Sequence, residues 1–487
     1  DSMVFLFVWL FAAAAAKIQV VDIGYKVPTP LPTQIAVQTC AGLYNRDETV
    51  AGAAYCFVSD VDPFWLAETE GLVNPPITPV ATFLARCLGN AGDQQDPAVA
   101  KGYILYNFTA QQRLLPNLYT LAAVLDAVPL EMGDKHTQGA KLIFDATKEW
   151  SGFSALQATS YMHSRYVNVT TGLAKLNPGY QEDGHHPLNP PLTGKPNPAL
   201  VDFVVKERLF CLFLQNGCIP ATQEHKLFEH VATSNPWPRP VRVYGYDNTW
   251  NVAGGDLFEA ETLCVKEHNL GQVASDSVTN LAFFSRKPSI SAPLLQNVAD
   301  SSDKVYNSSQ TYMAFIIGDG DNVGFLRDAR RSWMKRRVEK CQADPSYNGC
   351  FPLVWTLSPQ ITHLAPDWAR WYFNQTYITG KDFFVLPPSG DLYAYPGMMQ
   401  KSDQANFVVN TEQDCVLFNT SSTVEWEFFD GWGEAFRSYF PQYTASQLVR
   451  GFYCVNVPFD FPTFQWKEGE QYRLVHPSSS SSSSSSS

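Results

Sequence analysis

With 487 residues, of which 45% are hydrophobic and 17% charged, the chain is long enough for two globular domains, each with its own core. Its net charge of -12 argues against nucleic acid or an anionic membrane surface as a partner, because both bind basic patches. Aromatic residues make up 14% of the chain. They favour carbohydrate weakly, because sugar C–H faces stack on rings, and a core rich in Tyr and Phe explains them as well.

The first residues predict a signal peptide at residues 1–16. Val4 to Ala16 are all apolar and end in five Ala, a pattern typical of an apolar region before a cleavage site. The run is too short for a transmembrane helix, which needs about 20 apolar residues. The basic residues that usually precede such a run are missing, which suggests a start at Met3 or a truncated start. We expect a soluble protein that is secreted by a eukaryotic cell and has no membrane span.

Ten Cys residues, an even number, favour disulfides in a secreted chain. Cys211 with Cys218, and Cys341 with Cys350, are the candidate short loops. No Cys-x-x-Cys sequence occurs, which argues against a zinc ribbon or a thioredoxin motif. Asn-x-Ser/Thr sequences predict a glycoprotein, and they begin at Asn107, Asn168, Asn307, Asn374 and Asn419.

Residues 33–235 predict a smaller N-terminal domain of mixed α/β type. Apolar residues recur at helical spacing in residues 114–130 and 141–174. Asn235-Pro-Trp-Pro-Arg-Pro240 is the predicted boundary, because Pro at alternate positions blocks both helix and central strand.

Residues 236–470 predict a C-terminal (β/α) barrel-like domain, similar to a TIM barrel. Strands alternate with helices, which favours a parallel α/β sheet. The predicted strands are residues 241–244, 312–317, 353–357, 383–386 and 448–455. The predicted helices are residues 256–268, 323–340 and 366–377. The Ser tract at residues 478–487 cannot bury apolar surface and is predicted to be a flexible tail or linker.

Polar clusters follow four of the predicted strands at their carboxyl ends, where α/β proteins bind ligands. In a barrel they would face one another across a single mouth. They are Tyr246-Asp247-Asn248, Asp319-Gly-Asp321-Asn322, Thr356-Leu-Ser358, and Ser389-Gly-Asp391 with Tyr393 and Tyr395.

The same part of the chain resembles the GxGYxYP putative glycoside hydrolase family over about residues 240–400. The segment from Gly390 to Pro396 reads Gly-Asp-Leu-Tyr-Ala-Tyr-Pro and resembles the signature Gly-x-Gly-Tyr-x-Tyr-Pro. Leu392 replaces the second Gly of the signature. Because a position with positive φ tolerates Leu poorly, we expect this loop to differ from that of the family. The other similar stretches are Val243–Tyr246, Phe315–Asn322, Pro352–Pro359 and Leu364–Pro366.

The resemblance implies a hydrolase that acts on an oligo- or polysaccharide, and such an enzyme needs two carboxyl groups. Asp319 and Asp321 are too close in sequence to flank one bond, so we expect one of them to pair with Asp391 or Asp247. The predicted catalytic residues are Asp319, Asp321 and Asp391. The predicted substrate-binding residues are Tyr246, Asp247, Asn322, Trp355, Ser389, Tyr393 and Tyr395. A plainer interpretation of Asp321 and Asn322 is that one of them caps the following helix.

Other carboxylates and a histidine have two interpretations each. Glu425 and Glu427 share a strand face and could be a carboxylate pair. A strand whose polar residues alternate onto a solvent-exposed face explains them as well, and this interpretation is preferred. His363 follows a strand end and could face the mouth, although a structural histidine is the plainer interpretation.

Two further functions remain open. One is a non-catalytic extracellular glycan-binding protein, which the altered signature and the Ser tract favour. The other is a Mg²⁺-dependent phosphoryl-transfer enzyme, with Asp319 as nucleophile and Asp321 as acid/base. No cofactor is expected, and a divalent metal at Asp319, Asp321 and Asn322 has no support from spacing alone. The oligomeric state is open.

Overall fold

The computed structural model describes most of the chain between residues 18 and 455. The described residues are 18–46, 52–90, 98–178, 198–246, 268–296, 307–311, 313–344, 346, 349–427, 431–444 and 446–455. The predicted signal peptide, the predicted site residue Asp247 and the Ser tract lie outside them, as does nearly all of the predicted helix at residues 256–268.

The strands of the N-terminal half pair with one another only in parallel within the described residues, which confirms an α/β architecture. They form three sheets in the orders β1-β2, β4-β3-β5 and β7-β6-β8-β9. The strands are β1 (Ile18–Asp22), β2 (Ala53–Phe57), β3 (Gly102–Tyr106), β4 (Ala127–Glu131), β5 (Leu142–Asp145), β6 (Leu173–Leu176), β7 (Phe210–Leu212), β8 (Val241–Tyr246) and β9 (Leu270–Val273).

Helices cover these sheets, with α1 at the centre, where it contacts β2, β4 and α8. Gly42 lets α1 approach α8 closely, because a Cβ there would lie 2.4 Å from the backbone oxygen of Asp202. The helices are α1 (Leu31–Arg46), α2 (Val61–Glu70), α3 (Val80–Cys87), α4 (Phe108–Gln111), α5 (Leu115–Leu125), α6 (Ala146–Glu149), α7 (Ala155–Tyr166), α8 (Val201–Glu207), α9 (Gln223–Thr233) and α11 (Leu281–Phe284), with 3-10 turns η1 (Gln112–Leu114), η2 (Lys135–Thr137) and η3 (Val167–Val169).

Helical spacing of apolar residues predicted two helices in this half that are longer than the helices observed. The predicted helix at residues 114–130 ends at Leu125, because Asp126 adopts a left-handed conformation and the next residues form β4. The predicted helix at residues 141–174 is divided into β5, α6, α7 and the start of β6. Short strands and helix segments have similar apolar content, so apolar spacing alone does not distinguish them. Here β4 and β5 are strands because they pair with β3, and β6 is a strand because it pairs with β8.

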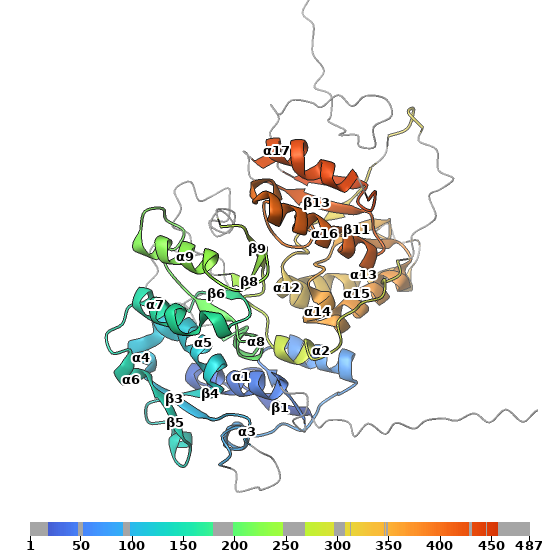
Figure 1. Ribbon diagram of the computed structural model, residues 1–487. Coiled ribbons are helices and arrows are strands. Elements are labelled where there is room, and N and C mark those ends of the chain that lie inside the picture. The colour runs from blue at the N-terminus through green and yellow to red at the C-terminus, as the bar shows by residue number, and fades with distance from the viewer. Residues whose placement is uncertain are drawn as a thin grey trace, which may run out of the picture.

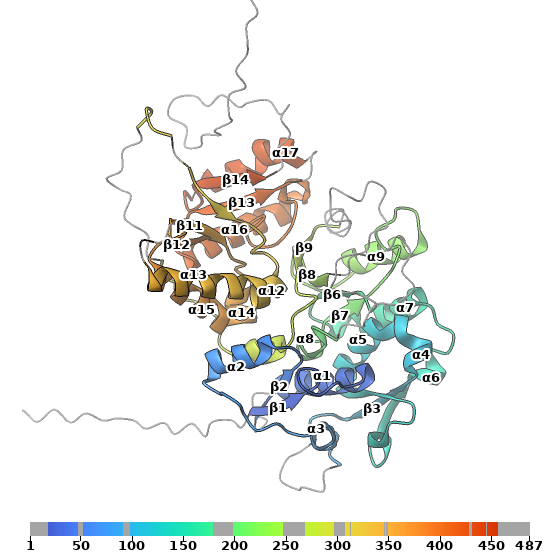
Figure 2. The same cartoon turned by 180° about the vertical axis from the view of Figure 1, so that it is seen from behind.

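The strands of the C-terminal half are parallel and follow one another in chain order. Figure 2 labels four of them, β11 to β14. Leu386 joins the two sheets of this half, since its N–H donates to Ser422 O (3.2 Å) and its carbonyl accepts from Val424 N (3.0 Å). The strands are β10 (Ile316–Ile317), β11 (Leu353–Thr356), β12 (Asp382–Val385), β13 (Ser422–Trp426) and β14 (Gly451–Val455). β10 is shorter than predicted because Met313 and Phe315 are exposed.

The helices of this half confirm the predicted alternation. α15, for example, has Pro in its first turn and ends at Gly380, which adopts the left-handed conformation that glycine favours. The elements are α12 (Val323–Phe325), the π-turn η4 (Leu326–Arg330), α13 (Arg331–Ala343), α14 (Ile361–Leu364), α15 (Pro366–Thr379), η5 (Pro396–Met398), α16 (Lys401–Leu417), α17 (Gly431–Glu434), the π-turn η6 (Ala435–Tyr439) and η7 (Phe440–Thr444).

The prediction of a barrel-like domain is not confirmed. A barrel closes when its first and last strands pair. In the part of the chain that the structure describes, β10 pairs only with β11 and β14 only with β13, so the sheet stays open.

The two halves lie side by side, the N-terminal half in blue to green and the C-terminal half in yellow to red (Figure 1). Helix α2 joins them, because Trp65 stacks on Trp368 of α15 at 4.9 Å between ring centroids. Arg327 also forms a buried ion pair with Asp62 (2.5 Å). The domain boundary at residues 235–240 remains a prediction, and the four-stranded sheet takes β6 and β7 from one side of it and β8 and β9 from the other.

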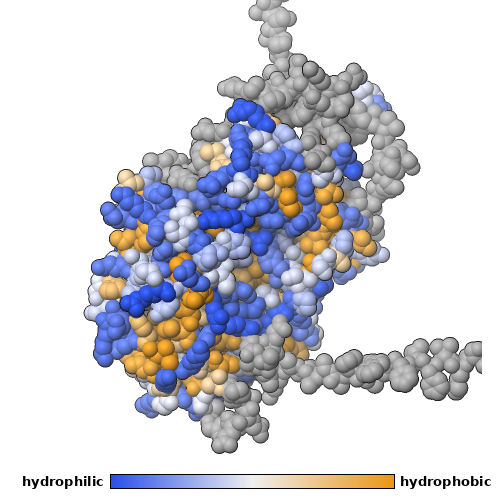
Figure 3. Space-filling view, in the orientation of Figure 1, coloured by the Kyte–Doolittle hydropathy of each residue, from blue (hydrophilic) through white to orange (hydrophobic). Residues whose placement is uncertain are grey.

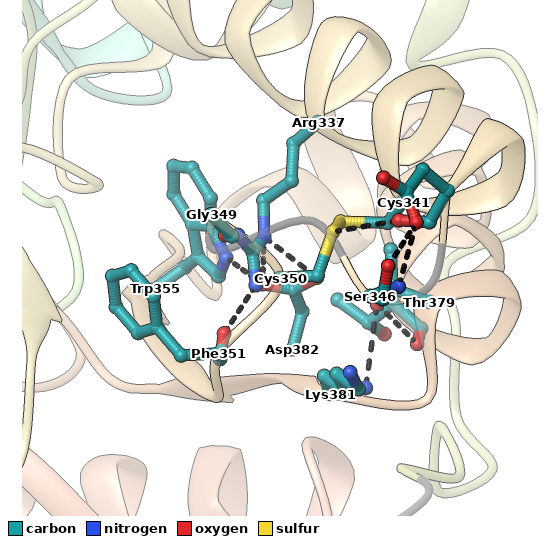
Figure 4. Close-up of a disulfide and its surroundings, with 12 residues drawn as sticks. Arg337, Cys341, Ser346, Gly349, Cys350, Phe351, Trp355, Thr379, Lys381 and Asp382 are labelled. Carbon is teal, nitrogen blue, oxygen red and sulfur yellow. Dashed lines mark hydrogen bonds and ion pairs between the residues drawn. A yellow bond between two sulfur atoms is a disulfide. The ribbon is translucent and has the colours of Figure 1, made fainter.

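One of the two predicted disulfides is confirmed and one is wrong. Cys341 and Cys350 are bonded beside the Arg337–Asp382 ion pair (Figure 4). Cys211 is a buried free thiol inside β7, whereas Cys218 lies beyond the end of that strand and is disulfide-bonded elsewhere. A further disulfide joins Cys40 of α1 to Cys87 of α3.

Hydrophilic residues cover much of the face in Figure 3, with apolar residues gathered in one area over each half. Apolar area of this extent is ordinary on globular proteins. Among the described helices, none combines the length and the apolar character that a membrane crossing requires.

Candidate functional site

The carboxyl ends of β8 and β9 meet the signature loop, which we define as residues 389–397. The N–H of Gly245 donates to Ser275 Oγ (2.9 Å), and the Gln272 side chain donates to the Gly245 carbonyl. Gln272 and Tyr393 then exchange two backbone hydrogen bonds of 2.8 and 3.1 Å. Tyr246, which ends β8, therefore belongs to the same edge of the structure as Tyr393.

The loop after β10 reaches the same edge. Val323 N donates to Ala274 O (2.8 Å), just past β9, and Gly320 N donates to Thr356 Oγ1 (2.9 Å), at the end of β11. Gly320 must be glycine here, since a Cβ would lie 2.0 Å from Thr356 O. The described members of all four polar clusters are thus linked through neighbouring strand ends.

Asp319 is exposed and has an unusual backbone. Its φ is 60°, in the left-handed region that costs most L-residues about 1–2 kcal/mol and that Asp tolerates better than most. Strained residues of this kind cluster at functional sites. The buried guanidinium of Arg330 lies under this loop and donates to the carbonyls of Gly318 and Thr356. Burial lowers the pKa of Arg330, and the charges of Asp319 and Asp321 act against that shift.

Asn322 caps the helix that follows. Its Oδ1 accepts from the N–H of Phe325 (2.9 Å), and α12 begins at the next residue. The prediction that Asp321 or Asn322 is a helix cap is confirmed for Asn322. Asp321 is half-buried between Asp319 and this cap.

Asp391 is enclosed and surrounded by donors. Its side chain is 3% exposed and accepts from Gln360 Nε2 (2.5 Å) and Asn410 Nδ2 (2.9 Å). The guanidinium of Arg242 lies 3.7 Å from its carboxylate. Three separate elements therefore fix Asp391: the turn after β11, helix α16 and strand β8.

A second carboxyl group, Asp414 of α16, interacts electrostatically with Asp391 and was not predicted. Burial, and then the charge of Asp391, raise the pKa of Asp414 well above its usual value. Asn410 and Asp414 are one helical turn apart, and this spacing was the only sequence signal for a shared face. His363 also interacts with Arg242 of this cluster. Burial first, and then the charge of Arg242, lower the pKa of His363 to about 3.

The remaining predicted residues of the signature loop are buried. Ser389 Oγ donates to the Trp426 carbonyl (2.7 Å) and accepts from the Trp426 N–H (3.0 Å). The rings of Tyr393 and Trp426 pack edge to face at 5.6 Å. Tyr395 precedes η5 and is also buried.

Trp355 is held in a different environment from the other site residues. Its indole N–H donates to Asp382 Oδ1 (2.8 Å), which also pairs with Arg337 (Figure 4). The side chain is buried, and Arg330 lies over its ring at 5.1 Å. These contacts support a structural role for Trp355, and its predicted role in substrate binding stays a prediction.

Leu392 does not disturb the loop in the way that the sequence suggested. Within the loop, a positive φ occurs at Gly390 (108°) and not at Leu392. Leu392 is buried against β9 and its carbonyl accepts from Ser389 N (3.1 Å). Leu392 is therefore accommodated without a positive φ, and the expected difference between this loop and that of the family stays a prediction.

Glu425 and Glu427 are not exposed, so the preferred interpretation of their alternation is wrong. Glu425 is 0% and Glu427 1% exposed. Within the described residues, no group of three or more His, Cys, Asp and Glu side chains lies close enough together to hold a metal ion.

Residues 309–457 match the GxGYxYP putative glycoside hydrolase C-terminal domain. A crystal structure of a putative hydrolase from Bacteroides thetaiotaomicron VPI-5482 is similar, with a TM-score of 0.66 and 18% sequence identity. That similarity covers 90% of this chain and 75% of the other. At this identity it shows a shared fold and nothing about activity. No curated protein matches the chain.

Proposed function

We propose, from the match of residues 309–457 to the GxGYxYP putative glycoside hydrolase C-terminal domain, that the protein hydrolyses glycosidic bonds in an oligo- or polysaccharide. The observation that carries this proposal is that two carboxylate-bearing loops, after β10 and after β12, both contact residues 356–360 at the end of β11. Thr356 contacts the Asp319 loop and Gln360, four residues later, contacts Asp391.

Hydrolysis of a glycosidic bond needs one carboxyl group that protonates the leaving oxygen and another that attacks carbon or activates water. Asp319 is exposed and can meet a substrate without rearrangement. Asp391 supplies the second carboxyl group from the signature loop, oriented by Gln360 and Asn410. Asp321 is the alternative to Asp319, because the two lie on the same loop.

We also propose that the protein is secreted. The Cys40–Cys87 and Cys341–Cys350 disulfides are typical of oxidising compartments. Asn168, Asn307, Asn374 and Asn419 are exposed, as glycan acceptors must be. Asn107 is half-buried and caps α4, so it is the weakest acceptor of the five.

The two other functions have less support. A non-catalytic glycan-binding protein was suggested by Leu392 and by the Ser tract. Leu392 is buried without a positive φ, which weakens the first reason, and the Ser tract lies outside the described residues. Phosphoryl transfer was suggested by the spacing of Asp319 and Asp321 and requires a bound Mg²⁺. Asn322 was the third candidate ligand, and its side-chain oxygen already accepts a hydrogen bond from the N–H of Phe325.

The test is a glycan hydrolysis screen with wild type, Asp319→Asn, Asp391→Asn and the control Asp328→Asn. Asn keeps the shape of Asp and tolerates the left-handed conformation of residue 319. Asp328 is exposed on η4, so its variant should keep full activity. We expect a loss of about 10²-fold or more for each site variant. Turnover that survives both site substitutions, or Mg²⁺-dependent phosphoester hydrolysis without glycan hydrolysis, would contradict the proposal.

A further inference from the structure

Strand β13 ends in a pair of buried glutamates that the proposed chemistry does not use. Glu425 and Glu427 are two residues apart, so they lie on the same face of the strand and its extension. Burial of two adjacent carboxylates is costly unless one of them is neutral. Burial, and then the charge of Glu427, raise the pKa of Glu425 well above its usual value.

Glu425 is connected to Asp391 through a chain of buried hydroxyl groups. Tyr439 donates to Glu425 Oε2 (3.3 Å), and the Tyr439 and Tyr443 hydroxyls are 3.0 Å apart. The side chain of Thr411 also interacts with Tyr443, where it opposes the rise that burial causes in the pKa of Tyr443. Thr411 Oγ1 then accepts from the backbone N–H of Asp391 (3.1 Å).

The other end of the signature loop is attached to Glu427. Glu427 Oε1 accepts from the N–H of Gly397 (2.5 Å). A Cβ at Gly397 would lie 3.0 Å from the other carboxylate oxygen, so this position leaves little room for a side chain. Trp426, between the two glutamates, holds Ser389 through both of its backbone groups. Residues 425–427 therefore contact the signature loop directly at Ser389 and at Gly397. They reach Asp391 indirectly, through the side chains of η6, η7 and α16.

We propose that Glu425 and Glu427 are positioning residues for the signature loop and that they hold one proton between them. Glu425 carries the proton, and Glu427 keeps the charge that accepts the Gly397 N–H. The consequence for catalysis rests on the proposed function, since it is Asp391 that the loop orients. The attachment of the loop does not depend on that function.

The described groups around Glu425 are consistent with a neutral carboxyl group at that residue. The titratable groups that face Glu425 are Glu427 on its own strand, Tyr439 of η6, Tyr443 of η7, Cys415 of α16 and Cys454 of β14. None of these groups is cationic. Loss of the shared proton at high pH would place two negative charges in this buried space and weaken the attachment of the loop.

The experiment measures amide hydrogen exchange in peptides that cover residues 389–397, from pH 5 to pH 9, after correction for the intrinsic pH dependence of exchange. The proteins are wild type, Glu425→Gln, Glu427→Gln and the control Glu339→Gln, whose side chain is exposed on α13. In wild type we expect exchange of the loop to become faster as pH rises. Glu425→Gln imitates the protonated acid and should remove that acceleration.

Glu427→Gln removes the charged acceptor and should speed exchange of the loop about tenfold at neutral pH, with little change elsewhere. Three results would overturn the inference: wild-type exchange in the loop that is independent of pH, equal effects of the two Gln substitutions, or faster exchange throughout the chain without a local excess. If Glu427→Gln does not fold, the wild-type and Glu425→Gln pH series still decide.

Activity separates this inference from the proposed function. If wild type hydrolyses a glycan, Glu427→Gln should lower kcat more than it raises KM, because the orientation of Asp391 is disturbed. If wild type hydrolyses none, the proposed function fails, and the exchange measurement still supports or overturns the positioning role.

Discussion

Leu392 of the signature loop occupies the space that a side chain at Gly271 of β9 would need. A Cβ at Gly271 would lie 2.3 Å from Leu392 Cδ1. Leu392 is 2% exposed, and the adjacent residues Gln272 and Tyr393 are paired through their backbones. The side chain that departs from the family signature is therefore accommodated by a glycine far away in the sequence.

This complementarity predicts coupled effects on stability. Gly271→Ala should destabilise the protein by about 1–3 kcal/mol, because the new methyl group overlaps Leu392. Leu392→Ala should cost about 2–5 kcal/mol through the cavity that it leaves. The double variant should lose less than the sum, since Leu392→Ala removes the overlap and the methyl group of Ala at position 271 fills part of the cavity. Urea unfolding of the four proteins measures this, and strictly additive losses would contradict direct packing.

Asp62 is predicted to be essential for joining the two halves. Its buried carboxylate accepts from Arg327, Thr279 and Asn280, and from the backbone N–H groups of Val58 and Ser59. Asp62→Ala leaves Arg327 buried without its counterion and should cost about 3–5 kcal/mol. The exposed neighbour Asp60 provides the control, and Asp60→Ala should change the free energy of unfolding by less than about 0.5 kcal/mol. Similar losses in both variants would argue against the ion pair as the cause.

His363 should make the protein less stable in mild acid. Its pKa is lowered to about 3 in the folded state, from 6.5 in the unfolded chain. The unfolded chain therefore takes up a proton first as pH falls through 6.5, and stability is lost progressively between about pH 6.5 and pH 3. His363→Gln should reduce the loss between pH 7 and pH 5 by up to about 2 kcal/mol. Unfolding free energies at both pH values measure this, with exposed His230→Gln as control. An equal acid loss in wild type and His363→Gln would refute the prediction.

The Cys341–Cys350 disulfide should stabilise the start of β11. It closes a short loop with a sequence separation of 9, and a loop of this size contributes about 2–3 kcal/mol in the chain-entropy estimate. The bond lies beside Arg337, which donates to Asp382 and to the Phe351 carbonyl (Figure 4). Replacing both Cys residues by Ser should lower the free energy of unfolding by that amount. Cys211→Ser, at a buried free thiol, shows the cost of the chemical change alone. A Cys341/Cys350 variant as stable as wild type would contradict the prediction.

Local sequence patterns predicted much of the secondary structure of the C-terminal half. Short apolar runs predicted β11, β12 and β14, and Pro366 correctly marked the start of α15. Polar residues after β8, β10, β11 and β12 predicted that the polar loops lie at one edge, because parallel strands share their direction. The signature from Gly390 to Pro396 identified the similarity that residues 309–457 confirm.

Packing between distant segments decided what those patterns left open. Whether residues 114–130 form one helix depended on pairing of β4 with β3, and whether the strands close into a barrel depended on the partners of β10 and β14. The burial of Glu425 and Glu427 comes from η6, η7 and α16, which an alternating strand pattern does not contain. Likewise, only the tertiary structure places Gly271 beneath Leu392 and Asp414 beside Asp391. The sequence by itself determined which residue types occupy the strand ends, because that depends on local turn and strand preferences. Their burial, partners and protonation depend on contacts between segments far apart in the chain, and these were decided by the tertiary structure alone.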